Sequence, residues 1–82
     1  MLINNNIPSG VREVLIYDDE KIIYIFIYIS SNVLDFITVS DNVIEYDNKA
    51  YTTDLNYISY ENCKNGLLKI KFNVLKEGEI NA

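Results

Sequence analysis

The chain has 82 residues with no histidine and one cysteine, and its formal net charge at pH 7 is −5. This length fits one domain, the lone cysteine excludes an internal disulfide, and the missing histidine excludes a histidine-ligated metal site or a histidine general base. The acidic balance argues against binding to a phosphate backbone, which depends on lysine and arginine displacing counterions.

The first ten residues, MLINNNIPSG, show neither the basic start nor the apolar stretch of a signal peptide. We therefore expect residues 1–82 to be a single domain with mobile ends at residues 1–10 and 77–82. One unpaired thiol without a targeting signal also leads us to expect a cytoplasmic protein, in the host cell if the protein is viral.

Residues 22–29, IIYIFIYI, form an uninterrupted run of apolar and aromatic side chains. Isoleucine and aromatic residues favour a strand, and polar turn residues stand on both sides of the run, at 18–21 and 30–32. A membrane-spanning helix needs about 20 apolar residues, so we expect no membrane contact. The run therefore predicts a strand that is apolar on both faces.

Two predicted hairpin loops define the pairing of this strand. With Asp19-Glu20 as the first loop, the predicted pairs are Ile16–Ile23, Val14–Ile25 and Arg12–Ile27. With Ser31-Asn32 as the second loop, they are Ile29–Leu34 and Ile27–Phe36. Both registers agree on one core face, made by Val14, Ile16, Ile23, Ile25, Ile27, Ile29, Leu34 and Phe36.

The opposite face of the same three strands is amphipathic and rich in tyrosine. It carries Leu15, Tyr17, Tyr24, Phe26, Tyr28, Asp35, Ile37 and Val39. Tyrosine is enriched at protein interfaces, because its ring gives a large contact area at low entropic cost. We predict a protein interface at Tyr17, Tyr24, Phe26, Tyr28, Ile37 and Val39. The alternative is that other strands cover this face and make it part of a closed core.

The next two strands, VIEY and AYTT, are predicted to pair across an Asn48-Lys49 loop, which places Tyr46 opposite Tyr51. Four carboxylates form a predicted acidic edge around them, at Asp41, Glu45, Asp47 and Asp54. The hairpin tip at residues 18–20 is also acidic, but it lacks the glycine and the ligand spacing of a calcium loop. We therefore predict no metal site and no cofactor.

The segment LLKIKFNV at residues 67–74 alternates between apolar and polar side chains, as a strand with one buried face does. A three-residue loop at Lys64-Asn65-Gly66, with Gly66 left-handed, gives the predicted pairs Tyr60–Ile70, Ile58–Phe72 and Glu61–Lys69. The alternative is a short helix with Asp54 as N-cap and Gly66 just past its end.

Together these segments predict an all-β fold. We expect a small antiparallel meander of six or seven short strands that closes into a barrel or a sandwich. A short helix near residues 55–64 is the alternative to a strand there.

No catalytic constellation is present, and Cys63, without a histidine partner, is expected to be a small hydrophobe and not a nucleophile. We therefore predict a non-enzymatic, protein-binding domain that self-associates through its tyrosine-rich face. Residues with A+T-rich codons are frequent, which favours a phage or mobile-element accessory protein, such as an inhibitor of a host defence complex. The alternative is a small barrel that binds or sequesters a small molecule or a nucleotide-like signal.

Overall fold

The computed structural model describes residues 10–29 and 42–79, and residues 1–9, 30–41 and 80–82 lie outside the description. The described residues are mostly in strands, with two single 3-10 turns and no longer helix, so the predicted all-β class is confirmed. The strands are β1 (Val11–Tyr17), β2 (Ile22–Tyr28), β3 (Val43–Tyr46), β4 (Lys49–Thr53), β5 (Ser59–Asn62) and β6 (Leu67–Glu79). The 3-10 turns are η1 (Leu55–Tyr57) and η2 (Lys64–Gly66).

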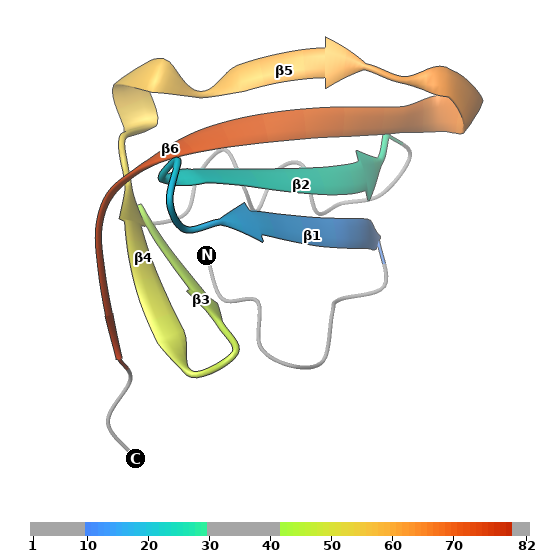
Figure 1. Cartoon of the computed structure of the whole chain (residues 1–82). Helices are drawn as coiled ribbons and strands as arrows, with labels where there is room; N and C mark the ends of the chain where they lie inside the picture. Colours follow the sequence, from blue (N-terminus) through green and yellow to red (C-terminus); the bar gives the residue numbers. More distant parts are fainter. Residues whose placement is uncertain (1–9, 30–41, 80–82) are drawn as a thin grey trace.

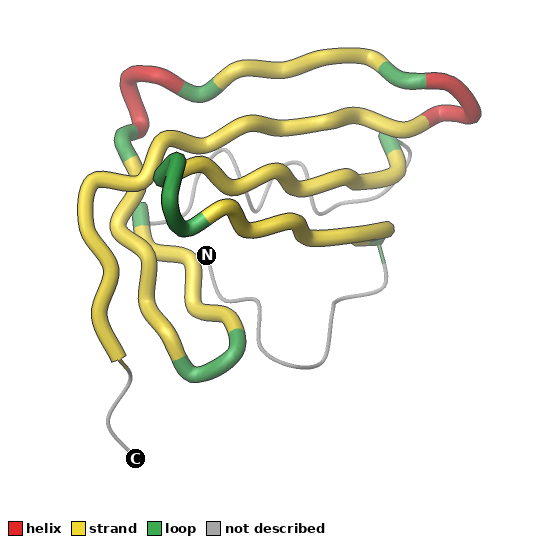
Figure 2. The backbone as a smooth tube through the Cα atoms, viewed as in Figure 1, coloured by secondary structure: helices red, strands yellow, loops and turns green. Residues whose placement is uncertain are grey.

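The described strands form one antiparallel sheet in the order β1-β2-β6-β4-β3, and β5 also pairs with β6. β6 is 13 residues long and connects the two parts of the sheet. Its first half lies between β2 and β5, and its second half pairs with β4 (Figure 1). The sheet curls, so that β3 and β4 run steeply across the direction of β1 and β2 and make a half-barrel (Figure 2).

This strand order differs from the predicted meander at β2. The second neighbour of β2 is β6, and Ile27 lies opposite Leu68 instead of Phe36. The pairing is favourable because β6 alternates, and its apolar residues extend the aliphatic face of β2 across the sheet. The predicted strand partner Phe36 and its neighbour Leu34 lie outside the described residues, as do the predicted interface residues Ile37 and Val39.

The β1–β2 hairpin confirms two predicted pairs, Ile16–Ile23 and Val14–Ile25. The third predicted pair is wrong, because Val11 and not Arg12 lies opposite Ile27. A bulge between Val11 and Glu13 makes Arg12 an extra residue on β1. The bulge places the apolar side chain of Val11 in the core and leaves Arg12 exposed.

The β3–β4 hairpin turns one residue earlier than predicted. Its loop is Asp47-Asn48, with φ angles of 53° and 63°, and the pairs are Tyr46–Lys49 and Ile44–Tyr51. The predicted pair Tyr46–Tyr51 is therefore wrong. Two left-handed residues in succession are typical of a type I′ turn, and aspartate and asparagine tolerate this conformation better than lysine does.

The β5–β6 hairpin follows the predicted register. Tyr60 lies opposite Ile70 and Glu61 opposite Lys69, with Lys64–Gly66 as the loop and Gly66 left-handed at φ 74°. The alternative helix is limited to the single turn η1. Asp54 is the N-cap of η1, and its side chain accepts a hydrogen bond from the Asn56 backbone at 3.0 Å.

β6 bends where it passes from one part of the sheet to the other. Thr53 lies opposite Val74 and Thr52 opposite Lys76, so Leu75 is an extra residue on β6. Beyond this bulge the strand continues to Glu79, which lies opposite Lys49. Residues 77–79, placed by the sequence in a mobile C-terminal end, are therefore part of a paired strand.

The core lies on the concave side of the curled sheet. Its centre is the predicted aliphatic face, where Ile23, Ile25 and Ile27 each have 0% of their surface exposed. Val14 and Ile16 pack at its margin, as predicted residues of that face. The other buried members are Val11, Ile44, Tyr51, Leu68, Ile70 and Phe72.

The prediction that Ile29 is a core residue is wrong. β2 ends at Tyr28, and the Ile29 side chain is 47% exposed. Its backbone N–H donates to the Gly66 carbonyl at 2.9 Å, which ties the end of β2 to the β5–β6 loop. Ile29 therefore belongs to the turn after β2, and its side chain does not continue the inward alternation of the strand.

Substitutions at the β3–β4 turn test this corrected register. Asn48→Gly should be more stable to urea than Asn48→Val by about 1–2 kcal/mol, because a β-branched residue is strained at positive φ. Lys49→Gly is the matched control. It should destabilise by roughly 0.5–1 kcal/mol, because Lys49 is a strand residue. If Lys49→Gly stabilises the protein instead, the loop is Asn48-Lys49 and the register is wrong.

Candidate functional site

The convex side of the sheet carries a row of aromatic and lysine side chains, which we call the tyrosine face. Its members come from β1, β2 and β6 and are Tyr17, Tyr24, Phe26, Tyr28, Lys69 and Lys71. They share a face because Tyr24 lies opposite Lys71 and Phe26 opposite Lys69, while the alternate residues of both strands are in the core. Regular alternation in two paired strands therefore builds this face.

The aromatic rings of the tyrosine face contact one another and a lysine. The rings of Tyr17 and Tyr24 meet edge-to-face, with centroids 5.7 Å apart and planes at 80°. The Lys69 Nζ lies 4.3 Å from the Tyr24 ring centroid and 5.9 Å from that of Phe26. Cation–π contacts at partly exposed sites contribute about 0.5–1 kcal/mol each, so they fix the position of the ammonium group over the rings.

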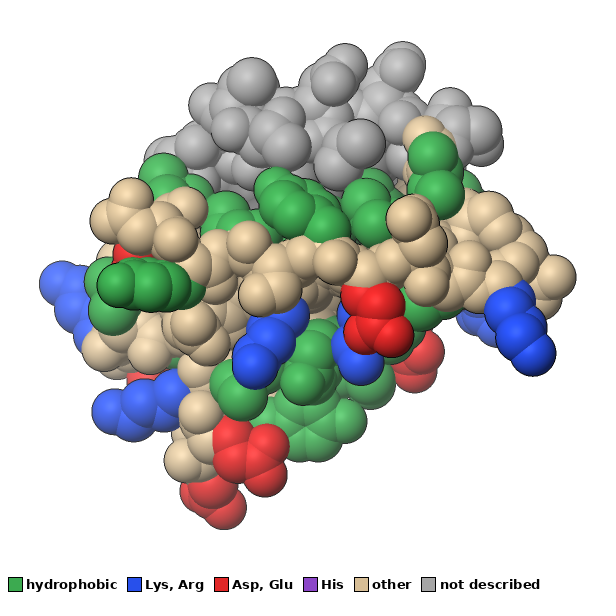
Figure 3. Space-filling model, turned by 90° about the horizontal axis from the view of Figure 1, so that it is seen from above, with side chains coloured by type: hydrophobic (Ala, Val, Ile, Leu, Met, Phe, Trp, Pro, Cys, Tyr) green, Lys and Arg blue, Asp and Glu red, His purple; other side chains and the backbone are tan. Residues whose placement is uncertain are grey.

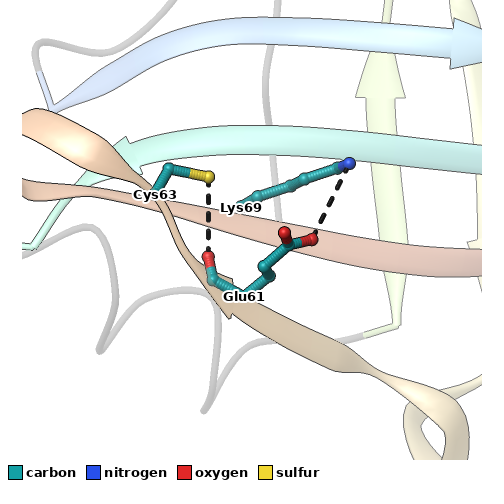
Figure 4. Close-up of polar contacts among 3 residues, drawn as sticks. All are labelled: Glu61, Cys63 and Lys69. Carbon is teal, nitrogen blue, oxygen red and sulfur yellow. Dashed lines mark hydrogen bonds and ion pairs between the residues drawn. The ribbon is translucent and has the colours of Figure 1, made fainter.

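Glu61 on β5 extends the face with a negative charge. Its Oε1 lies 3.9 Å from the Lys69 Nζ, and the two side chains point toward each other (Figure 4). Such exposed ion pairs contribute at most about 1 kcal/mol, and the Glu61 side chain is 71% exposed. The nearby Cys63 is a free, partly exposed thiol, and its Sγ lies 3.8 Å from the Glu61 carbonyl oxygen.

The tyrosine face combines exposed rings with balanced charge. Tyr17 and Tyr28 are each 42% exposed, and Tyr24 and Phe26 are half-buried. Lys69 and Lys71 are matched by Glu61 and by Glu13, which lies opposite Phe26. Seen from above, charged side chains of both signs lie beside hydrophobic ones (Figure 3). The face thus has charges of both signs beside it, although the whole chain carries a net charge of −5.

Four of the six predicted interface residues lie together on the tyrosine face, at Tyr17, Tyr24, Phe26 and Tyr28. The other two, Ile37 and Val39, fall outside the described part of the chain. Sequence reasoning missed Lys69 and Lys71. The alternation of polar and apolar residues in 67–74 can be read from the sequence, but the position of the two lysines beside the tyrosines depends on the pairing of β6 with β2.

The predicted acidic edge is not a cluster of carboxylates. Asp47 is in the turn at one end of β4, Asp54 follows the other end, and Glu45 is on β3 opposite Ala50. Asp41 lies outside the described residues. Within residues 10–29 and 42–79, no group of three or more acidic, cysteine or histidine side chains could hold a metal ion.

A pocket of about 280 Å³ lies where the β1–β2 turn meets the bend of β6. Its floor includes Tyr51, which is only 3% exposed. The other lining residues are Ile16, Tyr17, Asp18, Lys21, Val74, Leu75, Lys76 and Glu77. Sequence reasoning missed this pocket, because the pocket forms only when β6 bends and continues past Leu75.

The pKa of Tyr51 is raised above the ordinary tyrosine value of 10.0. Burial is the largest cause, because it removes water from the phenolate form. The negative charges of Asp18, Glu77 and Asp47 act in the same direction, in that order. Tyr51 therefore keeps its phenol proton and is neutral at physiological pH.

Comparison with known protein families, with curated proteins and with solved structures finds no match for this chain. In the part of the chain that the structure describes, no helix is long and apolar enough to cross a membrane.

The raised pKa of Tyr51 predicts a loss of stability in alkali. The unfolded phenol ionises first, so the stabilising effect is complete below about pH 10 and is lost as pH rises through the higher folded pKa. The melting temperature of wild type should therefore fall more steeply above about pH 10 than that of Tyr51→Phe. Tyr57→Phe is the control, because Tyr57 is 66% exposed. Parallel curves for wild type and Tyr51→Phe would contradict the assignment.

Proposed function

We propose that this protein is a non-enzymatic protein-binding domain that self-associates through the tyrosine face. The observation that carries the proposal is the row of four aromatic side chains on the convex side of the sheet, with Lys69 held over two of the rings. Large rigid aromatic groups with a cation among them are the residue types that dominate binding energy at protein interfaces. This face offers them on paired strands that need no reorganisation on binding.

The balance of charges favours a second copy of the chain as the occupant. Two molecules of net charge −5 repel each other, and the tyrosine face is a place where they could approach with little repulsion. In a two-fold dimer the same patch contacts itself, so Lys69 and Lys71 of one copy could meet Glu13 and Glu61 of the other. A face with both signs of charge is complementary to itself in this way.

The cellular context is proposed from composition and from the binding surface together. Frequent residues with A+T-rich codons favour a phage or mobile-element accessory protein. An acidic body attached to a compact binding face would suit an inhibitor of a host defence complex, because it could engage a basic surface of that complex. Such a protein would act in the cytoplasm of the host cell.

A second candidate function is the binding of a small molecule, and the pocket beside Tyr51 is the observation that favours it. The pocket combines apolar walls with a few polar groups, as ligand pockets do. It lies at the bend of β6 and shares Tyr17, but not Tyr24, Phe26 or Tyr28, with the tyrosine face. Self-association and ligand binding would therefore use mostly different residues and meet at Tyr17.

Charge introduced on the two faces of β2 tests the main proposal. Tyr28→Asp and Tyr24→Asp should leave the sheet folded and shift the molecular mass in light scattering from oligomer to monomer, because the new charge is solvated in the free chain. Ile25→Asp should unfold the domain. A buried unpaired charge costs several kcal/mol, against a total stability of about 5–10 kcal/mol.

Tyr57→Asp is the matched control for these variants, since Tyr57 is an exposed tyrosine on η1 and not on β1, β2 or β6, the strands that make the tyrosine face. It should retain both the fold and the oligomeric mass of wild type. A wild-type protein that is monomeric at all accessible concentrations would refute self-association. Unfolding of Tyr28→Asp in circular dichroism would show that this face is intramolecular core.

A further inference from the structure

The pocket beside Tyr51 has the geometry of a small ligand site. Ile16, Val74 and Leu75 give it apolar walls. Its inner end is the part beside Tyr51, which is 3% exposed, and the charges of the lining residues Asp18 and Glu77 act on the Tyr51 hydroxyl there. Its volume of about 280 Å³ is near the lower end of ligand pockets, which measure about 300–1,000 Å³. A narrow molecule with one polar end would fit these dimensions.

Negative charge dominates around the buried hydroxyl. Asp18 reaches it from the β1–β2 turn, Glu77 from β6 and Asp47 from the β3–β4 turn, and all three raise the Tyr51 pKa. Lys21 and Lys76 also line the pocket and are exposed, as Asp18 and Glu77 are, but the charges that act on the Tyr51 hydroxyl are those of carboxylates. The part of the pocket beside Tyr51 therefore favours a positive group.

The hydrogen-bonding capacity at the inner end agrees with the charge. The carboxylates of Asp18 and Glu77 are acceptors only. The Tyr51 hydroxyl oxygen also has lone pairs that can accept a hydrogen bond. A ligand group that donates hydrogen bonds therefore finds three acceptors here.

We propose that this pocket binds an alkyl chain that ends in an ammonium or guanidinium group. The cation sits at the inner end, where Asp18, Glu77 and the Tyr51 oxygen accept its hydrogen bonds. The chain lies against Ile16 and Val74, and the Tyr17 ring covers it. The same chemistry occurs in a free amine and in the side chain of a lysine or arginine in a peptide. The proposal deepens the small-molecule function, and its site shares Tyr17 with the tyrosine face.

The test titrates the full chain with three probes while amide resonances are followed by NMR. Agmatine represents a free guanidine, N-acetyl-arginine amide a peptide-borne one, and glutarate a small anion of similar length. At least one of the two cations should bind saturably and shift the amides near Asp18, Tyr51 and Glu77. Glutarate should not shift them.

Two variants locate the site. Asp18→Asn should weaken cation binding at least about tenfold, because a charge-assisted hydrogen bond is lost. Asp19→Asn is the matched control, since Asp19 is the next residue of the same turn and does not line the pocket. It should bind as wild type does. Tyr51→Phe, with its fold checked by circular dichroism, should also weaken binding, because the accepting oxygen is gone.

The outcomes separate this inference from the broader candidate function. Binding of agmatine alone identifies a free amine as the ligand, and binding of the arginine amide identifies a peptide side chain as a ligand. Binding of glutarate in preference to both cations would overturn the proposed chemistry and leave a small-molecule function standing. No saturable binding of either cation at millimolar concentration would overturn the proposal, as would equal affinity of Asp18→Asn and Asp19→Asn.

Discussion

The antiparallel pairing of β2 with β6 holds the core together and positions both candidate sites. Seven consecutive residue pairs join the two strands, from Ile22–Asn73 to Tyr28–Leu67. Three of these pairs, Ile23–Phe72, Ile25–Ile70 and Ile27–Leu68, are made entirely of buried apolar side chains. Each such side chain contributes roughly 1.5–3 kcal/mol by leaving water, so this ladder holds much of the stabilising burial of a small domain. It also joins the β1–β2 hairpin to β6, the strand with which both β4 and β5 pair.

Both candidate sites follow from this pairing. Alternation that places isoleucines inside must place Tyr24, Phe26 and Tyr28 outside, and β6 adds Lys69 and Lys71 beside them. The same strand then bends at the Leu75 bulge and brings Glu77 toward Tyr51 and the β1–β2 turn. β6 thus supplies lysines to the tyrosine face and, a few residues later, lining residues to the pocket beside Tyr51.

The sequence predicts well those features that depend on local chemistry. Asp19-Glu20 and Lys64-Asn65-Gly66 have turn residues at the right spacing, and the registers that they imply are found next to both turns, up to the bulge at Arg12 in β1. The β3–β4 turn was misplaced because three polar residues, Asp47, Asn48 and Lys49, all suit a turn. The choice among them depends on bringing Ile44 and Tyr51 into the core.

Features that depend on distant parts of the chain were not predictable in the same way. Residues 33–39 and 67–74 are both apolar on alternate positions, so either could pair with β2, and the shorter loop made the first look favourable. The bulges at Arg12 and Leu75 have no local signal. The pocket requires the second bulge, which explains why Tyr51, Asp18 and Glu77 were not grouped from sequence.

If one face of β2 packs in the core of its own chain and the other binds a second copy, the two faces should respond differently to dilution. In a dilution series followed by two-dimensional NMR, we expect concentration-dependent shifts at Tyr24, Phe26 and Tyr28 and at the lysines beside them, while the core methyl groups of Ile23, Ile25 and Ile27 stay unchanged. Shifts that spread through the isoleucine methyl groups, or that are confined to β3, β4 and η1, would contradict this expectation.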